Sequence, residues 1–312
     1  MINNQTRIFI AGHKGMLGSS ILRILRKKGY KNLITVEKKK LDLRNQLLVK
    51  KFFNKKRPQA VIIAAAKVGG IKANMDYPAD FIQDNLQIQT NLISTSYNSK
   101  VKKLILFGSS CIYPKNLKKP IRENQMMTGP LEETNDSYSV AKIAGIKMIE
   151  AFNKQYKKSF ICLMPCNLFG PNDNYDTNNS HFLPALIKKI YLASKRKKNK
   201  VVKLWGTGKP LREVLHVDEV GEACEYFLRK KTNSHLINIG SSTEKSIKEY
   251  AKKIRDKIDP GIHIWFDNNK RLDGVKRKKL NLNLARNYGW KSKMNFDEAL
   301  DKTIKDFIIE HS

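Results

Sequence analysis

Short apolar runs alternate along this chain with longer segments in which hydrophobic residues recur every three or four positions. Continuous apolar runs are typical of buried parallel strands, and the longer period is typical of helices packed on a sheet. The runs predict strands at 7–11, 32–36, 60–66, 103–107 and 160–164, and the segments between them predict helices at 15–29, after residue 43, at 78–99 and at 138–157. This alternation predicts a doubly wound parallel α/β sheet of the Rossmann type.

The pattern becomes less regular after residue 170. A polar stretch at 172–180 predicts a loop, residues 205–210 predict a turn, and the rest predicts helices at 181–193, 217–230, 247–258 and 295–309 with strands at 201–204, 235–239 and 263–266. We therefore expect a first domain at 1–170 and a smaller C-terminal α/β lobe at 171–312 that closes over it. Some C-terminal segments are expected to return to the first domain.

A glycine-rich turn joins the first predicted strand to the first predicted helix. Gly12, Gly15 and Gly18 follow a G-x-x-G-x-x-G spacing, which lets the backbone approach a pyrophosphate at the positive end of a helix. The alternative is a simple turn. Ligands of such sheets bind beyond the carboxyl ends of the strands. A dinucleotide is therefore expected to contact Gly12, His13, Lys14, Gly15, Met16, Leu17, Gly18, Ala64, Ala65, Ala66, Pro165, Cys166, Asn167 and Leu168.

The end of the second predicted strand decides which dinucleotide binds. An acidic residue there favours a free ribose 2′-hydroxyl, and a basic residue favours a 2′-phosphate. The chain has both, Glu37 and Lys38, and Lys14 in the glycine turn adds another cation. We expect NADP rather than NAD. Asp42 is placed either to bond the adenine amine or to cap the next helix.

Tyr138 and Lys142 lie four residues apart, on one face of a predicted helix. A phenol titrates near ~10, and an adjacent ammonium lowers that pKa, so Tyr138 is expected to pass a proton to a carbonyl oxygen. Ser109 is placed to hydrogen-bond the same oxygen, and Lys142 to hold the nicotinamide ribose. A Y-x-x-x-K pair also arises by chance on surface helices. Together with the glycine turn, the pair indicates a nicotinamide-dependent carbonyl reductase.

Cys111 and His181 form a second candidate pair. A cysteine at a strand end near cations can act as a thiolate base, and His181, which opens a helix after the polar loop, is its candidate acid partner. Alternatively, Cys111 is inert packing. No metal site is predicted, since His216 and Asp218 fit a helix cap better than a ligand pair. The nucleophile motif G-x-S-x-G is absent from the sequence.

Composition restricts the class of protein. The chain is 41% hydrophobic, which suffices for a large core, but no apolar run approaches the ~20 residues of a membrane helix. The polar N-terminus does not resemble a secretory signal. The four cysteines form no C-x-x-C pair. We expect a reduced, cytoplasmic protein without a membrane partner.

The net charge of +32, from 60 basic and 28 acidic residues, raises the question of a nucleic-acid partner. Lysine far outnumbers arginine, and the basic residues are spread along the whole chain in short clusters. We expect a solvated basic surface, which also favours phosphate-bearing ligands. The rival interpretation is a nucleic-acid-binding protein on a Rossmann scaffold. It predicts salt-dependent RNA or DNA binding that does not need Tyr138.

Several of these motifs together resemble the GDP-L-fucose synthases, a family of extended short-chain dehydrogenases/reductases. The matching segments are 11–18, 64–71, 77–82, 108–114, 138–146, 179–181 and 205–208, and the run through Cys111 is highly specific. The resemblance covers essentially the whole chain. It implies that NADPH is used to convert GDP-4-keto-6-deoxy-D-mannose to GDP-L-fucose, by 3,5-epimerisation and then 4-keto reduction.

The resemblance also implies roles for individual residues. Cys111 would be the base and His181 the acid of both epimerisations, and Tyr138, Lys142 and Ser109 would direct hydride transfer to C4. Lys142 and His181 would also contact the cofactor, with Lys38 and Asp42 at its adenosine end. The positions at which the family holds GDP correspond to Lys188, Trp205, Arg212 and Arg277. The family forms homodimers through two long helices of each subunit, so a homodimer is expected.

The chain departs from the family pattern in two places. Lys14 and Lys38 stand where some relatives have arginine, and lysine cannot form a fork with phosphate. At 272–278 both prolines of the family's P-D-G-x-P-R-K pattern are missing, so the GDP contacts of this loop are expected to differ. The nearest rival is a related GDP-sugar reductase or epimerase acting on another sugar, such as a heptose. The presence of Cys111 and His181 favours double epimerisation.

Overall fold

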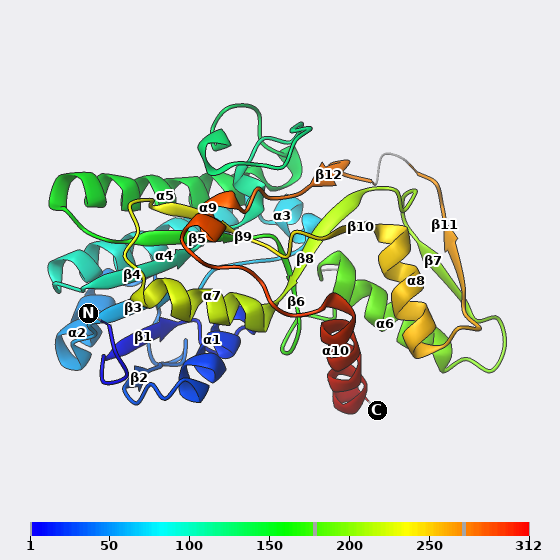
Figure 1. Ribbon diagram of the computed structural model, residues 1–312, viewed down its shortest axis with the longest axis horizontal. Coiled ribbons are helices and arrows are strands. Elements are labelled where there is room, and N and C mark those ends of the chain that lie inside the picture. Colours follow the sequence, from blue (N-terminus) through cyan, green and yellow to red (C-terminus); the bar gives the residue numbers. More distant parts are fainter. Residues whose placement is uncertain (1, 177–179, 270–272, 312) are drawn as a thin grey trace.

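Six parallel strands form the central sheet of the computed structural model, which describes residues 2–176, 180–269 and 273–311 (Figure 1). In sheet order they are β2 (Leu33–Ile34), β1 (Ile8–Ala11), β3 (Ala60–Ile63), β4 (Lys103–Phe107), β5 (Ile161–Pro165) and β9 (Leu236–Ile239). All of them except β2 are buried along their whole length, because helices cover both faces. The predicted doubly wound parallel sheet is confirmed.

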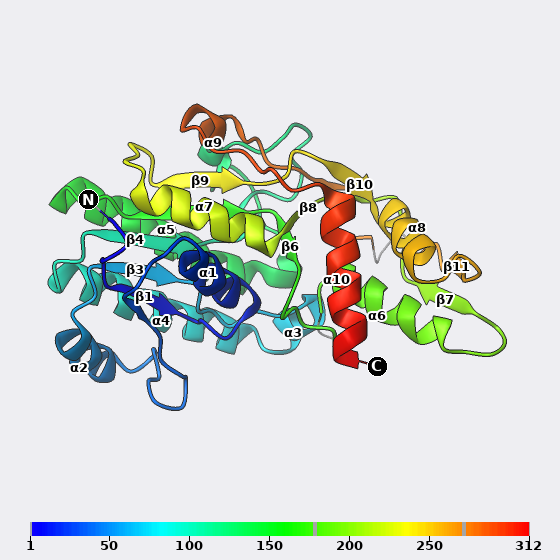
Figure 2. The same ribbon diagram turned by 60° about the horizontal axis from the view of Figure 1, so that its bottom comes forward.

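Helices cover both faces of this sheet (Figures 1 and 2). On one face α1 (Met16–Lys27) packs against α7 (Val217–Arg229); on the other α4 (Pro78–Asn98) packs against α5 (Asp136–Tyr156), and α2 (Gln46–Lys56) lies beside α4. The contact between α1 and α7 is close because Gly221 lacks a side chain. A Cβ at Gly221 would lie 2.8 Å from Cγ1 of Ile24.

The second half of the chain contributes to the central sheet and also forms a lobe of its own. Both β9 and α7 return to the sheet, as expected for some C-terminal segments, and α9 (Asn283–Asn287) packs on β9. The lobe surrounds a second hydrophobic cluster, on the right in Figure 1. Its strands are β6 (Asn167–Phe169), β8 (Leu211–His216), β10 (Glu244–Ser246) and β12 (Arg277–Lys278) in one sheet and β7 (Val201–Leu204) with β11 (His263–Phe266) in another; its helices are α6 (Phe182–Ser194), α8 (Ile247–Ile258) and α10 (Phe296–His311).

Several short elements were not predicted from the sequence. They are β6, β8, β10, β12, α3 (Ile71–Asp76), α9 and the 3₁₀ turns η1 (Ser110–Ile112), η2 (Glu123–Gln125) and η3 (Glu133–Asn135). In β8 a fully buried carboxylate interrupts the apolar pattern. Glu213 accepts hydrogen bonds from the backbone amides of Ser242 at 2.7 Å and Leu280 at 2.9 Å. Since its partners are distant in sequence, no local pattern indicates this strand.

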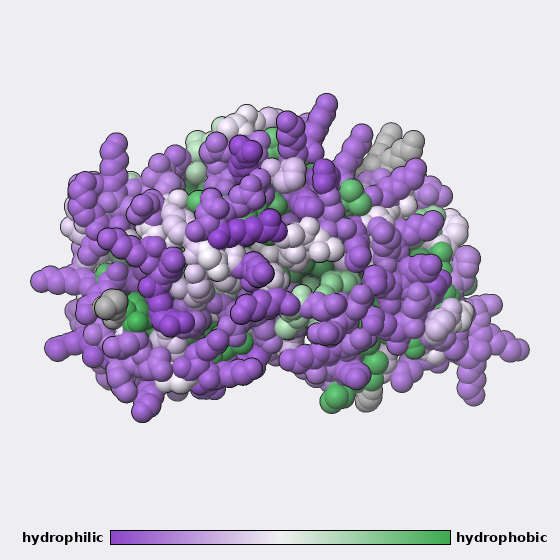
Figure 3. All heavy atoms as spheres, in the orientation of Figure 1, coloured by the Kyte–Doolittle hydropathy of each residue, from purple (hydrophilic) through white to green (hydrophobic). Residues whose placement is uncertain are grey.

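The surface seen in Figure 3 is mostly hydrophilic, in agreement with the high content of charged residues. Across the described residues, no helix combines the length and apolarity that a membrane span requires. The same residues contain no group of three His, Cys, Asp or Glu side chains arranged to hold a metal ion.

Candidate active site

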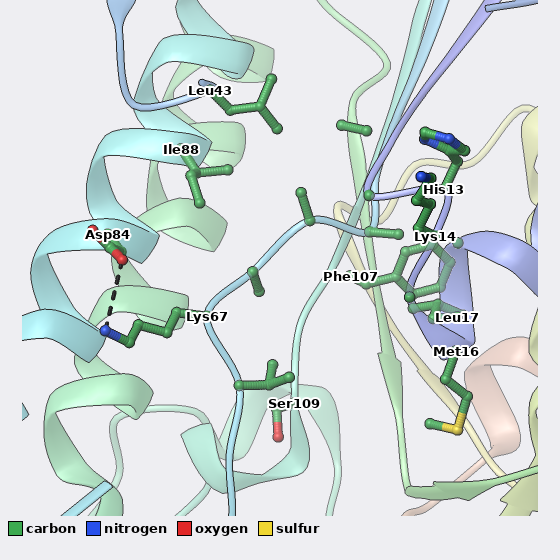
Figure 4. Close-up of a pocket in the computed structure, with 18 of the residues that line it drawn as sticks. His13, Lys14, Met16, Leu17, Leu43, Lys67, Asp84, Ile88, Phe107 and Ser109 are labelled. Carbon is green, nitrogen blue, oxygen red and sulfur yellow. Dashed lines mark ion pairs between the residues drawn. The ribbon is translucent and has the colours of Figure 1, made fainter. Parts of the chain in front are cut away.

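A cavity of about 580 Å³ lies beyond the carboxyl ends of β1, β3, β4 and β5. Every residue expected to contact a dinucleotide lines it, from the glycine turn to His181, and so do Lys38, Asp42, Ser109, Tyr138 and Lys142. Figure 4 shows His13, Lys14, Met16 and Leu17 on one side, and Leu43, Ile88, Asp84 and Lys67 on the other. In the central sheet the strand order reverses between β1 and β3, since β2 lies on one side of β1 and β3 on the other. Ligands of doubly wound sheets bind at such a point.

The three glycines of the turn have different structural roles. Gly12 has a φ of +87°, and a Cβ there would lie 2.6 Å from the amide nitrogen of Ala65. A Cβ at Gly18 would collide with the carbonyl oxygen of Gly12. By contrast, the nearest atom to a Cβ at Gly15 would be 3.6 Å away. Gly12 and Gly18 therefore allow the turn to close, whereas Gly15 leaves the N-terminus of α1 open, where a pyrophosphate is expected.

Two ion pairs lie at the end of the cavity expected to hold the adenosine. Lys14 Nζ lies 2.5 Å from Glu37 Oε1, and this contact lowers the pKa of Glu37. The Arg44 guanidinium donates to both oxygens of Asp42, at 3.0 and 2.8 Å, and lowers the pKa of that carboxyl. Arg44 was not identified from the sequence, although it follows Asp42 by two positions. Asp42 does not cap α2, because Asn45 accepts the amide of Leu48 at 3.0 Å.

Tyr138 of α5 lines the cavity and is half-buried. Burial raises its pKa well above the ordinary value, the charge of Cys111 adds to the rise, and a hydrogen bond with Ser109 opposes it. The expected lowering by Lys142 is not found. The Lys142 Nζ donates to the Phe107 carbonyl oxygen at 3.0 Å and lies 5.6 Å from the centre of the Tyr138 ring, and burial lowers its own pKa.

Cys111 and His181 belong to different elements, η1 and the residue before α6. Cys111 lies in η1, is 5% exposed and does not line the cavity itself. His181 precedes α6 and is accessible from the cavity, although desolvation by the surrounding protein lowers its pKa. Within the described residues no hydrogen bond joins the two side chains. Lys278 of β12, which was not anticipated, lies within electrostatic range of Cys111; burial lowers its pKa and the thiol opposes that shift.

The residues expected to hold GDP lie in the second lobe. Trp205 is 68% exposed, and the cation above its ring, 4.9 Å from the centroid, is Lys189, the neighbour of Lys188 in α6. Arg212 donates to the carbonyl oxygens of Val275 and Leu211 at 2.6 and 2.9 Å.

The described part of the loop at 272–278, residues 273–278, is held partly by contacts within the lobe. Arg277 donates through Nε to both carboxylate oxygens of Glu244 at 3.0 Å. Asp273 accepts the amide and hydroxyl of Thr207 at 2.7 and 2.8 Å. Leu272, and Asn179 of the segment at 179–181, lie outside the described residues.

Comparison with known proteins identifies the family. Residues 8–240 match the NAD dependent epimerase/dehydratase family. The chain belongs to this family. Within it, the chain is 44% identical to GDP-L-fucose synthase 1 of Arabidopsis thaliana, over 97% of this chain and 93% of that protein. The resemblance drawn from the sequence motifs is confirmed, and the chain is an enzyme of the epimerase/dehydratase family.

Two solved structures resemble this epimerase/dehydratase closely. The GDP-mannoheptose C4 reductase from Campylobacter jejuni with NADP bound superposes with a TM-score of 0.91 at 33% identity, over 99% of this chain and 100% of that chain. A GDP-L-fucose synthetase from Naegleria fowleri bound to NADP gives a TM-score of 0.90 at 29% identity, over 100% of this chain and 95% of that chain.

Proposed function

We propose that this chain uses NADPH to convert GDP-4-keto-6-deoxy-D-mannose to GDP-L-fucose, by inverting C3 and C5 and then reducing the 4-keto group. The observation that carries the proposal is that Tyr138, Ser109 and His181 line the same cavity as the glycine turn, and that Cys111 lies within electrostatic range of Tyr138. The similarity to GDP-L-fucose synthase 1 of Arabidopsis over nearly the full length supports it.

The epimerisations need one base and one acid. The 4-keto group acidifies the protons on C3 and C5, because the carbanion that forms is delocalised onto the carbonyl oxygen. Cys111 in its thiolate form removes each proton, and His181 returns a proton to the opposite face of the same carbon. Each inversion breaks one C–H bond and forms another, so no co-reactant is consumed. Lys278 of β12 lies within electrostatic range of Cys111.

The reduction then needs one hydride and one proton. When bound in the cavity, NADPH would supply the hydride to C4. Tyr138 supplies the proton to the carbonyl oxygen, since its raised pKa keeps the phenol protonated at neutral pH. Ser109 holds the same oxygen by a hydrogen bond. Lys142 is tied to the Phe107 carbonyl at the end of β4 and positions the nicotinamide ribose.

The dinucleotide is proposed to lie along the glycine turn, with its 2′-phosphate near Lys14 and Lys38. Residues up to 170 bind the cofactor, and the lobe formed by most of 171–312 binds GDP through Trp205, Arg212 and a lysine of α6. A homodimer formed through α4 and α5 fits two long neighbouring helices of 21 residues each. A reducing cytoplasm suits the four cysteines, all of which are free and buried.

Product analysis tests the proposal against a heptose-reducing relative. The purified protein is incubated with NADPH and either GDP-4-keto-6-deoxymannose or a GDP-4-keto-heptose, and the products are separated by anion-exchange chromatography. We expect one GDP-L-fucose formed for each NADPH oxidised, and slow turnover of the heptose. Oxidation of NADPH with the heptose alone would overturn the proposal.

A further inference from the structure

A second hollow, of about 540 Å³, lies at the opposite edge of the central sheet. Arg7, Gln59 and Lys102 border it just before β1, β3 and β4, and the C-terminal ends of α2 and α4 complete the wall. Because these three strands are parallel, their amino ends face away from the cofactor cavity at their carboxyl ends. The hollow is therefore separate from the proposed active site.

The rim of this hollow is cationic. It contains Arg7, Lys50, Arg57, Lys100 and Lys102, which are all exposed, and no acidic residue lines it. In the part of the chain that the structure describes, none of these five forms an ion pair with a carboxylate. Like charges gathered without counter-charges repel one another, and a bound anion would relieve that repulsion.

The cofactor cavity provides a contrast. Lys14 there is paired with Glu37, Arg44 with Asp42, and Lys67 with Asp80 at 2.5 Å. The chain thus places carboxylates beside cations at its catalytic cavity but not at this second hollow. A general excess of lysine does not by itself account for that difference.

The wall of the hollow also carries a buried polar group without a partner. Thr95 of α4 is 3% exposed, and within the described residues its Oγ1 takes part in no hydrogen bond. An unsatisfied buried hydroxyl costs free energy. The hydroxyl has almost no accessible surface, so a ligand oxygen in the hollow would accept from it, and remove that cost, once the Thr95 side chain rotates towards the ligand.

The C-terminal ends of α2 and α4 repel an anion in the hollow, but only weakly. A helix C-terminus carries about −0.5 charge, so α2 and α4 together contribute about −1 against five full positive charges. Some of the end carbonyls are already satisfied. Arg57 O accepts from Arg7 Nε at 2.9 Å, and Phe53 O accepts from the amide of Arg57 at 2.7 Å. The net field in the hollow therefore favours a multiply charged anion.

We propose that this hollow binds a small polyphosphate-bearing anion. The exposed lysines and arginines pair with its phosphate oxygens, and the Thr95 hydroxyl donates to one of them. A nucleic-acid strand fits less well, since single-strand sites combine a basic groove with exposed aromatic platforms. Phe53, the aromatic side chain that lines the hollow, is 1% exposed.

Titration calorimetry on the full chain tests the site. The protein is loaded with one equivalent each of NADP⁺ and GDP, and inorganic tripolyphosphate is the probe. We expect one further binding event, which the double variant Lys50→Gln/Lys102→Gln weakens about tenfold, as expected for the loss of two phosphate ion pairs. The matched control Lys51→Gln/Lys55→Gln removes the same charge outside the hollow and should change the affinity less than twofold. Equal weakening in the two double variants, or no further event, would overturn the proposal.

Two further arms sharpen the test. Thr95→Val keeps the side-chain shape without the hydroxyl, and we expect severalfold weaker binding without a lower melting temperature; unchanged affinity would contradict the contact with Thr95. A single-stranded RNA 12-mer replaces tripolyphosphate in the other arm. The proposal of a small anion would be overturned in favour of a nucleic acid if two results were found together. Lys50→Gln/Lys102→Gln would weaken RNA binding, and tripolyphosphate would fail to displace the RNA.

Discussion

Lys14 and Glu37 form an ion pair at the end of the cavity expected to hold the adenosine, with 2.5 Å between Nζ and Oε1. Lys14 belongs to the glycine turn, and Glu37 follows β2. A carboxylate at this position can bond the free 2′-hydroxyl of NAD, whereas a cation there favours the 2′-phosphate of NADP. Because each side chain neutralises the other, we propose that the pair sets the balance between the two dinucleotides.

Glu37→Gln should shift that balance towards NADPH. The substitution releases Lys14 for a 2′-phosphate and removes an acceptor for a 2′-hydroxyl. An exposed ion pair contributes up to ~1 kcal/mol, so we expect the ratio of kcat/KM for NADPH to that for NADH to rise about fivefold. Glu222→Gln is the control, since its ion pair with Lys28 links α7 to the end of α1 outside the cavity lining. An unchanged ratio would show that Glu37 does not face the ribose.

Gly15→Ala should weaken cofactor binding without harming the fold. At Gly15 the backbone φ of −75° suits any residue, and a new Cβ would meet nothing closer than 3.6 Å. The same methyl would occupy the approach of the pyrophosphate, so we expect the KM for NADPH to rise at least tenfold with little change in melting temperature.

Gly18→Ala is the matched comparison. Its Cβ would collide with the Gly12 carbonyl, a backbone group that cannot yield, and overpacking of this kind costs about 1–3 kcal/mol. We therefore expect a clearly lower melting temperature. Normal NADPH binding by Gly15→Ala would place the dinucleotide elsewhere.

Titration of Tyr138 should not change the rate of reduction between about pH 6 and pH 9. Burial raises the pKa of Tyr138 above its ordinary value near ~10. The protonated phenol is the donor, so it is lost only when the pH rises through that raised pKa. Stopped-flow measurement of NADPH oxidation at several pH values checks this. A fall in rate that vanishes in Tyr138→Phe and is centred near pH 7 would contradict it.

Lys189→Ala should weaken substrate binding more than Lys188→Ala. Lys189 lies 4.9 Å from the centre of the Trp205 ring, and burial lowers its pKa. A partly exposed cation–π contact contributes about 0.5–1 kcal/mol, so we expect the KM for the GDP-sugar to rise two- to fivefold with Lys189→Ala. The neighbouring Lys188→Ala serves as the control. A larger effect at Lys188 would contradict this prediction and favour the assignment made from the family pattern.

The sequence predicts the central sheet well, because its strands are buried on both faces and read as uninterrupted apolar runs. The predicted strand at 103–107 coincides with β4, and the helix at 247–258 coincides with α8. The predictions fail where polar groups are buried. Glu213 in β8 is satisfied by the amides of Ser242 and Leu280, which only the tertiary structure brings together.

Parts of the candidate site that depend on the spacing of residues within one motif were predicted. Features that depend on burial, or on contacts between residues distant in sequence, were missed. The turn from Gly12 to Gly18 and the pair Tyr138–Lys142 depend on local geometry, and both line the cavity. The pKa of Tyr138 depends on burial, which outweighs the cation four residues away. Lys278 approaches Cys111 across more than 150 residues of sequence, a proximity that no local spacing contains.

Isotope exchange tests the double epimerisation most directly. The protein is incubated in heavy water with GDP-4-keto-6-deoxymannose and NADPH, and deuterium in the GDP-sugar is located by NMR, for the unmodified chain and for Cys111→Ser and Tyr138→Phe. We predict deuterium at C3 and C5 of the GDP-L-fucose product. Cys111→Ser should suppress this exchange, while Tyr138→Phe keeps it and slows NADPH oxidation by about 10²–10⁴-fold. Reduction without deuterium uptake, or normal exchange in Cys111→Ser, would contradict the assignment.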